Sequence, residues 1–85
     1  MDYSQHPEAQ WFRDEEWKLW VYRLGRAFVT LAPRQPYCDR GHFDGKVFGV
    51  DDIDYADSFP RYYMDEARAK LELADWLHWR LKVPK

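Results

Sequence analysis

The pattern of apolar and polar positions predicts strands in the middle of the chain. Residues 17–23 and 27–31 are rich in aromatic and β-branched side chains, and Gly25 lies between them where a tight turn needs a positive φ. We therefore expect a β-hairpin. The alternative is a single helix, because five apolar residues also recur at helical spacing: Trp17, Val21, Leu24, Phe28 and Leu31. The glycine and the β-branched residues favour the hairpin.

Two further strand signals and one weaker helical signal flank this hairpin. Asp44-Gly45 predicts a second hairpin turn that joins residues 37–43 to residues 47–50, and Pro33 and Pro36 separate it from the first hairpin. Residues 59–64 are short and aromatic, which predicts a strand with Pro60 at its start or on an edge. Residues 1–13 are expected to form a short helix or an arm, with Trp11 and Phe12 as its apolar anchor.

Residues 65–82 predict a C-terminal helix, because they contain neither Gly nor Pro and are rich in strong helix formers. Asp65 suits the N-cap, Glu66 and Lys70 form a favourable i,i+4 pair, and Pro84 limits extension. We expect one apolar stripe to pack on the sheet: Ala67, Leu71, Ala74, Leu77 or His78, and Leu81. On this prediction, truncating Leu71 is costly and Glu72 lies at the surface.

Together these elements predict one α+β domain spanning residues 1–85. A small antiparallel sheet of three to five strands, two hairpins plus a strand within residues 17–64, carries the helix on one face. A chain of 85 residues is long enough for one hydrophobic core and too short for two.

Composition adds a surplus of aromatic residues. Five Trp, six Tyr and five Phe make up 19% of the chain. A small core cannot hold them all, so several rings are expected at the surface, where aromatic side chains are typical of binding hot spots. The other interpretation is a small core built mainly from large rings. Net charge is only −2, but acidic residues gather within residues 1–16 and again within residues 44–57.

Other sequence features limit the cellular location and the chemistry. No apolar stretch approaches a membrane span, no signal-peptide pattern opens the chain, and the single Cys38 cannot form an internal disulfide, so we expect a cytoplasmic protein. Cys38 and His42 lack the paired spacing of a zinc site, and the acidic segment lacks the glycine and the final glutamate of a calcium loop. We expect no metal, no cofactor and no enzymatic activity.

Two surfaces are candidates for binding. The first presents carboxylates and rings to a basic protein surface, such as one that holds nucleic acid: Asp44, Phe48, Asp51, Asp52, Asp54, Tyr55 and Asp57. The second contacts nucleic acid by stacking and phosphate binding: Arg34, Tyr37, Arg40, Arg61, Tyr62 and Tyr63. The acidic segment is equally explained as a solvated loop without a binding role. A third class of function is a structural or oligomerisation subunit, joined through an edge strand and exposed rings.

In its small size, its Asp-rich stretch, its surplus of Trp and Tyr and a hairpin-rich body that ends in residues 62–70, the chain resembles phage-encoded accessory proteins of the anti-CRISPR type. The resemblance implies a stoichiometric inhibitor that docks on a bacterial defence complex in the host cytoplasm. It carries over no site residue, because those proteins share no diagnostic motif.

Overall fold

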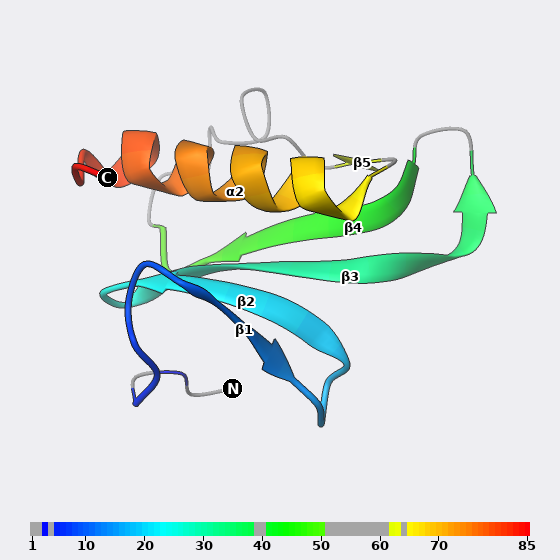
Figure 1. Ribbon diagram of the computed structural model, residues 1–85, viewed down its shortest axis with the longest axis horizontal. Helices are drawn as coiled ribbons and strands as arrows, with labels where there is room; N and C mark the ends of the chain where they lie inside the picture. The colour runs from blue at the N-terminus through cyan, green and yellow to red at the C-terminus, as the bar shows by residue number, and fades with distance from the viewer. Residues whose placement is uncertain (1–2, 4, 39–40, 51–61, 64) are drawn as a thin grey trace.

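In the described part of the chain, five antiparallel strands and one helix form the fold. The computed structural model describes residues 3, 5–38, 41–50, 62–63 and 65–85. In chain order the elements are β1 (Trp11–Asp14), β2 (Leu19–Leu24), β3 (Ala27–Cys38), β4 (Gly41–Phe48), β5 (Tyr62–Tyr63) and α2 (Glu66–Leu81). The strands are ordered β1-β2-β3-β4-β5, and α2 lies along one face of the sheet (Figure 1). The predicted α+β class with one C-terminal helix on the sheet is confirmed.

The first predicted hairpin is present, and the helical alternative is wrong. Leu24 pairs with Ala27 across the turn, and Gly25 has a φ of 62°. Strand β2 begins at Leu19 instead of Trp17, because residues 15–18 form the turn between β1 and β2. The predicted strand at residues 59–64 is represented by β5 at Tyr62–Tyr63, and its other positions lie outside the described residues.

The turn predicted at Asp44-Gly45 is wrong. Strand β4 runs through both residues, with Asp44 paired to Ala32 and Gly45 paired to Leu31. The chain reverses between Cys38 and Gly41 instead. Pairing of β4 with Phe28–Pro33 and again with Cys38 satisfies more backbone groups than a short hairpin would. A register shift between Pro33 and Cys38 accommodates the prolines, which lack a donor.

The short N-terminal helix is also wrong for the described residues. Residues 5–10 form bends and turns, and Trp11 and Phe12 belong to strand β1. Successive side chains of a strand point to opposite faces, so the two rings separate. Trp11 packs against the core beneath α2, whereas Phe12 contacts Tyr3 on the other face.

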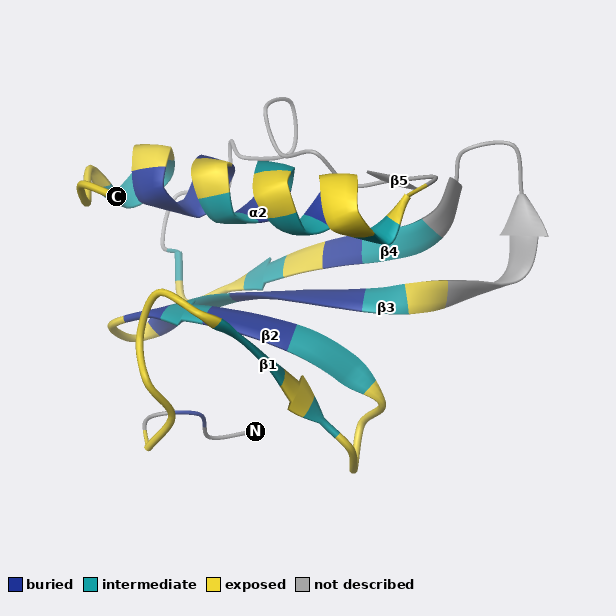
Figure 2. Cartoon of the chain, viewed as in Figure 1, coloured by how far each residue is buried: buried dark blue, intermediate teal, exposed yellow. Residues whose placement is uncertain are grey.

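The hydrophobic core lies between the sheet and α2 (Figure 2). Strand residues such as Val29 and Leu31 are fully buried, as are Leu73 and Leu77 of the helix. On the opposite face Val21 and Thr30 are also buried. The sheet is therefore covered on both sides at its centre.

The predicted stripe of α2 is wrong at its N-terminal half. Leu71 is 66% exposed and Ala67 is exposed, whereas the fully buried Ala69 and Leu73 face the sheet. Leu77 is buried as predicted, and Ala74 and Leu81 are partly buried against the core. The helix has apolar residues on nearly every side, and the stripe that includes Leu73 and Trp76 removes more apolar area from water.

The ends of α2 follow the sequence prediction. The Asp65 carboxylate accepts a hydrogen bond from the Arg68 N–H, as an N-cap does, and Lys70 pairs with Glu66 at 3.2 Å. Lys82 closes the helix in the left-handed conformation. Within the described residues, α2 is neither long enough nor apolar enough to cross a membrane.

Candidate functional site

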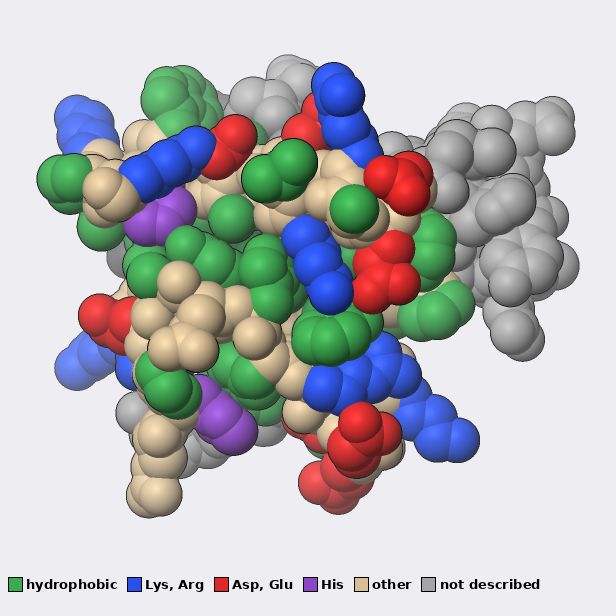
Figure 3. Space-filling model, in the orientation of Figure 1, with side chains coloured by type: hydrophobic (Ala, Val, Ile, Leu, Met, Phe, Trp, Pro, Cys, Tyr) green, Lys and Arg blue, Asp and Glu red, His purple; other side chains and the backbone are tan. Residues whose placement is uncertain are grey.

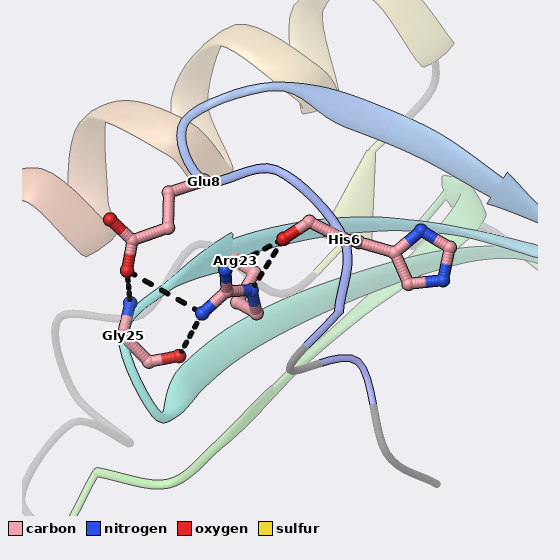
Figure 4. Close-up of polar contacts among 4 residues, drawn as sticks. All are labelled: His6, Glu8, Arg23 and Gly25. Atoms are coloured by element: carbon pink, nitrogen blue, oxygen red, sulfur yellow. Dashed lines mark hydrogen bonds and ion pairs between the residues drawn. The ribbon is translucent and has the colours of Figure 1, made fainter.

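The site is built on a clamp that fastens the N-terminal segment to the β2–β3 turn. Arg23 of β2 donates through Nε and Nη2 to the His6 carbonyl, at 3.2 and 2.6 Å, and through Nη1 to the Gly25 carbonyl at 2.7 Å (Figure 4). Glu8 accepts from the Gly25 N–H at 2.6 Å and lies 3.4 Å from Arg23 Nη1. Because the arginine fork holds three groups at once, residues 6–8 have a fixed path along the sheet.

The clamp places the rings of the N-terminal segment against the sheet face that is turned away from α2. The His6 ring stacks on Phe12 with centroids 4.0 Å apart and an interplanar angle of 5°. Tyr3 contacts Phe12 and Phe28 edge-on at 5.4 and 5.0 Å, and Phe28 in turn stacks on Phe48 at 4.9 Å. These contacts form a second, smaller apolar cluster opposite the main core.

Asp14 joins this cluster to the β1–β2 turn. Its Oδ2 accepts a hydrogen bond from the Tyr3 hydroxyl at 2.7 Å. Its Oδ1 accepts from the backbone N–H groups of Glu16 and Trp17 at 3.0 and 3.1 Å, the pattern of an Asx turn. One carboxylate therefore fixes both the N-terminal segment and the turn of residues 15–18.

The electrostatics of Asp14 and Tyr3 agree with this geometry. The Tyr3 hydroxyl, followed by the Trp17 N–H, holds the pKa of the Asp14 carboxyl below its ordinary value. Burial, together with the hydrogen bond to Asp14, raises the pKa of Tyr3 far above its ordinary value. Asp14 is consequently ionised and Tyr3 protonated at neutral pH, so this hydrogen bond is charge-assisted.

A hollow of about 320 Å³ lies between the N-terminal segment and the β1–β2 turn. Rings of Tyr3, His6, Phe12 and Trp17 contribute to its lining. The charged residues that line it are Arg13, Asp14, Glu15 and Glu16, three carboxylates against one guanidinium. The hollow thus combines aromatic surface with negative charge, a combination that attracts cations.

Three side chains of the turn, those of Glu16, Trp17 and Lys18, have no hydrogen bond, ion pair or ring contact among the described residues. Trp17 is 57% exposed. Arg13 lies 3.8 Å from Glu15 and 5.6 Å from the Trp20 ring. The backbone of the turn is fixed, while the Trp17 ring, the Glu16 carboxylate and the Lys18 ammonium are available.

Other exposed apolar side chains lie on α2. Leu71 and Trp79 are each 66% exposed on the outer side of the helix. On the face that carries α2, Lys and Arg side chains lie beside Asp and Glu side chains (Figure 3). Trp20, at the edge of this face, already has the Lys70 ammonium 3.4 Å from its ring centroid. No continuous surface of one charge forms over α2 in the part of the chain shown.

Of the predicted acidic surface, the structure places only two residues. Asp44 lies within β4 and is partly buried, instead of at the tip of a hairpin, and Phe48 is 38% exposed at the end of the same strand. The remaining members lie outside the described residues: Asp51, Asp52, Asp54, Tyr55 and Asp57.

Of the predicted nucleic-acid surface, the structure places backbone positions only. Arg34 and Tyr37 belong to β3, and Tyr62 and Tyr63 form β5, which pairs with β4 at Asp44 and Phe43. Pro33 pairs with Phe43, so these segments meet at one end of the sheet. Arg40 and Arg61 fall outside the described part of the chain.

The residues of the hollow were not predicted as a site. From the sequence, Asp14, Glu15 and Glu16 belong to the acidic block of residues 1–16, and Trp17 belongs to a predicted strand. The usable signal was the acidic block of residues 1–16 followed by a tryptophan. That signal did not show that Tyr3 and His6, which lie eleven and eight residues before Asp14, would pack near it.

Among the described residues, no group of three His, Cys, Asp or Glu side chains is placed to hold a metal ion. His78 is buried, and its Nδ1–H donates to the Val83 carbonyl at 3.0 Å. Its Nε2 accepts from the Tyr22 hydroxyl at 2.8 Å, so in the neutral ring both nitrogens have structural partners.

No family model, curated protein or solved structure matches this sequence.

Proposed function

We propose that the protein is a non-enzymatic binding protein that docks on a basic surface of a protein partner through the turn of residues 15–18 and the hollow beside it. The observation that carries the proposal is the pairing of a fixed backbone with unused side chains. Asp14 holds the turn, while the Trp17 ring and the Glu16 carboxylate point to no partner in the described protein.

Physical chemistry supports this use of the turn. Tryptophan is among the commonest hot-spot residues, because a rigid ring gives a large contact area for little lost entropy. A turn whose backbone is already ordered loses less freedom on binding than a mobile loop does. Carboxylates around the ring favour a basic partner and repel an acidic one.

The resemblance to phage-encoded inhibitors of the anti-CRISPR type suggests the kind of partner. We propose a bacterial defence complex in the host cytoplasm, whose basic nucleic-acid-binding surface this protein blocks by stoichiometric binding. The acidic residues of 51–57 would extend the same charge complementarity.

The test is capture of partners from a nuclease-treated bacterial lysate, followed by binding of the purified partner. The wild type is compared with the double variant Trp17→Ala/Glu16→Gln and with Trp79→Ala, which removes a similarly exposed tryptophan from α2. We expect a basic protein whose binding is lost in the double variant and kept in Trp79→Ala. Unchanged binding by the double variant would remove the turn from the proposal.

A gel-shift assay separates this proposal from the nucleic-acid-binding alternative. A salt-dependent shift of single-stranded DNA or RNA would favour the surface that carries Arg34, Tyr37, Tyr62 and Tyr63. Under our proposal, the protein leaves both nucleic acids unshifted at low salt.

A further inference from the structure

The hollow beside residues 15–18 has the chemistry of a receptor for one cationic side chain. Its lining carries three carboxylates and one guanidinium, which gives a formal charge of −2 with His6 neutral. The Arg13 guanidinium does not neutralise the whole rim, because it lies near Glu15 and over the Trp20 ring. Glu16 keeps its charge unpaired among the described residues.

Aromatic surface at the same place favours a cation that stacks. Tryptophan binds cations over its ring more strongly than tyrosine or phenylalanine does, and the Trp17 ring is exposed. The Trp20 ring, on the α2 side of the sheet, already has cations near it, with Lys70 at 3.4 Å and Arg13 at 5.6 Å. Trp17, in the turn itself, lacks such a partner in the described structure.

Arginine fits this combination better than lysine. A guanidinium is planar, so one face can lie on the Trp17 ring while its N–H groups reach the Glu16 carboxylate in the same plane. An ammonium is a strongly hydrated point charge and cannot make both contacts so fully. We infer that the hollow receives an arginine side chain of the basic partner, an inference that rests on the proposed function and names the group that the turn binds.

The experiment titrates the intact protein with acetyl-Gly-Gly-Arg-Gly-Gly-amide at low salt and follows the amide and indole N–H signals by NMR. Two peptides of equal length replace the arginine by lysine or by citrulline, its neutral isostere. We expect saturable shifts of the Trp17 indole and of the amides of residues 14–18. The lysine peptide should bind several-fold more weakly, and the citrulline peptide should cause no saturable shift.

Matched variants locate the site. Glu16→Gln and Trp17→Ala should each weaken arginine binding about tenfold, the loss expected for one charge-assisted or cation–aromatic contact. Glu72→Gln and Trp79→Ala change the same residue types on α2 and should leave binding unchanged. The spectrum of each variant shows directly whether its fold is kept.

Three results would overturn the inference: equal binding of the citrulline or lysine peptide, shifts centred on α2, or no saturable shift in the wild type. If the arginine peptide does not bind but Trp17→Ala still abolishes partner binding, the arginine assignment is wrong and the proposed function stands. If the peptide binds but Trp17→Ala leaves partner binding unchanged, the arginine site stands and the turn of residues 15–18 is removed from the proposed function.

Discussion

Asp14 of β1 connects the N-terminal segment to the β1–β2 turn through one carboxylate. It holds the backbone of the β1–β2 turn through the N–H groups of Glu16 and Trp17, and it holds the N-terminal segment through the Tyr3 hydroxyl. The position of Trp17 relative to the hollow therefore depends on a contact eleven residues away in sequence. Because this hydrogen bond joins a protonated Tyr3 to an ionised Asp14, the free energy of unfolding depends on pH.

Tyr3 should make the protein lose stability at alkaline pH. Burial and the Asp14 hydrogen bond raise the pKa of Tyr3 in the folded state, and burial raises the pKa of Tyr22. Their contribution is complete below the unfolded value near 10 and is lost as pH rises toward the folded value. We expect the free energy of unfolding, measured by urea denaturation, to fall above about pH 10 and to fall less steeply in Tyr3→Phe. Equal slopes in the two proteins would contradict this account.

Gly25 and Gly49 provide a matched pair for backbone strain, since both have positive φ, 62° and 80°. A Cβ at Gly25 meets nothing within 4 Å, whereas one at Gly49 would lie 2.6 Å from the Arg26 carbonyl oxygen. Gly25→Ala should lower the free energy of unfolding by about 1–2 kcal/mol, the penalty for a side chain in the left-handed backbone region. Gly49→Ala should destabilise by about 2–4 kcal/mol, because overpacking adds to that penalty. Chemical denaturation compares the two; similar values would mean that the chain near Gly49 yields easily.

At the scale of the elements, the sequence predicted what local chemistry determines. Gly25 specified a turn, and Asp65 specified the start of α2, because each acts within a few residues of its own position. Asp44-Gly45 misled, because a good turn dipeptide is overridden when β3 offers a long edge for pairing. The site was missed because it depends on contacts between residues far apart in the sequence. Tyr3 meets Asp14 only after the sheet has formed.

The face of α2 shows a second limit of local patterns. Two stripes along this helix have similar spacing and both include Leu77, so periodicity alone does not choose between them. The choice depends on what the sheet presents, where Tyr22 receives His78 and Trp20 receives Lys70. Such tertiary partners are invisible in the helix sequence.

Leu73 and Leu71 test which face is buried. Leu73 is fully buried between helix and sheet, and Leu71 is 66% exposed. Leu73→Ala should lower the free energy of unfolding by about 2–5 kcal/mol, and Leu71→Ala by less than about 0.5 kcal/mol. Urea midpoints of the two variants decide the question. A larger loss for Leu71→Ala would restore the stripe that periodicity predicted.

At the scale of the whole molecule, the sheet is covered by α2 on one face and by the N-terminal segment on the other. The second cover depends on the Arg23 clamp, since Arg23 binds the His6 and Gly25 carbonyls and pairs with Glu8. The hollow exists only while this segment is seated. The clamp therefore supports the candidate site from a distance.

Loss of the clamp should expose the N-terminal segment. We expect Arg23→Ala to be cut after Glu8 by a glutamate-specific protease markedly faster than the wild type, because the fork no longer holds residues 6–8. Arg26→Ala is the control, since Arg26 is exposed in the same turn and its side chain makes no hydrogen bond or ion pair among the described residues. Equal cleavage of the wild type and Arg23→Ala would show that the rings alone seat the segment.

The surface used for binding is tested most directly by hydroxyl-radical footprinting of the unmodified protein, alone and with its purified partner. Trp17 and Trp79 are both exposed, at 57% and 66%, and both oxidise readily, so each reports on its own side of the molecule. We predict that the partner protects Trp17 strongly and leaves the oxidation of Trp79 unchanged. Protection of Trp79 with unchanged oxidation of Trp17 would contradict the account and place the interface on α2.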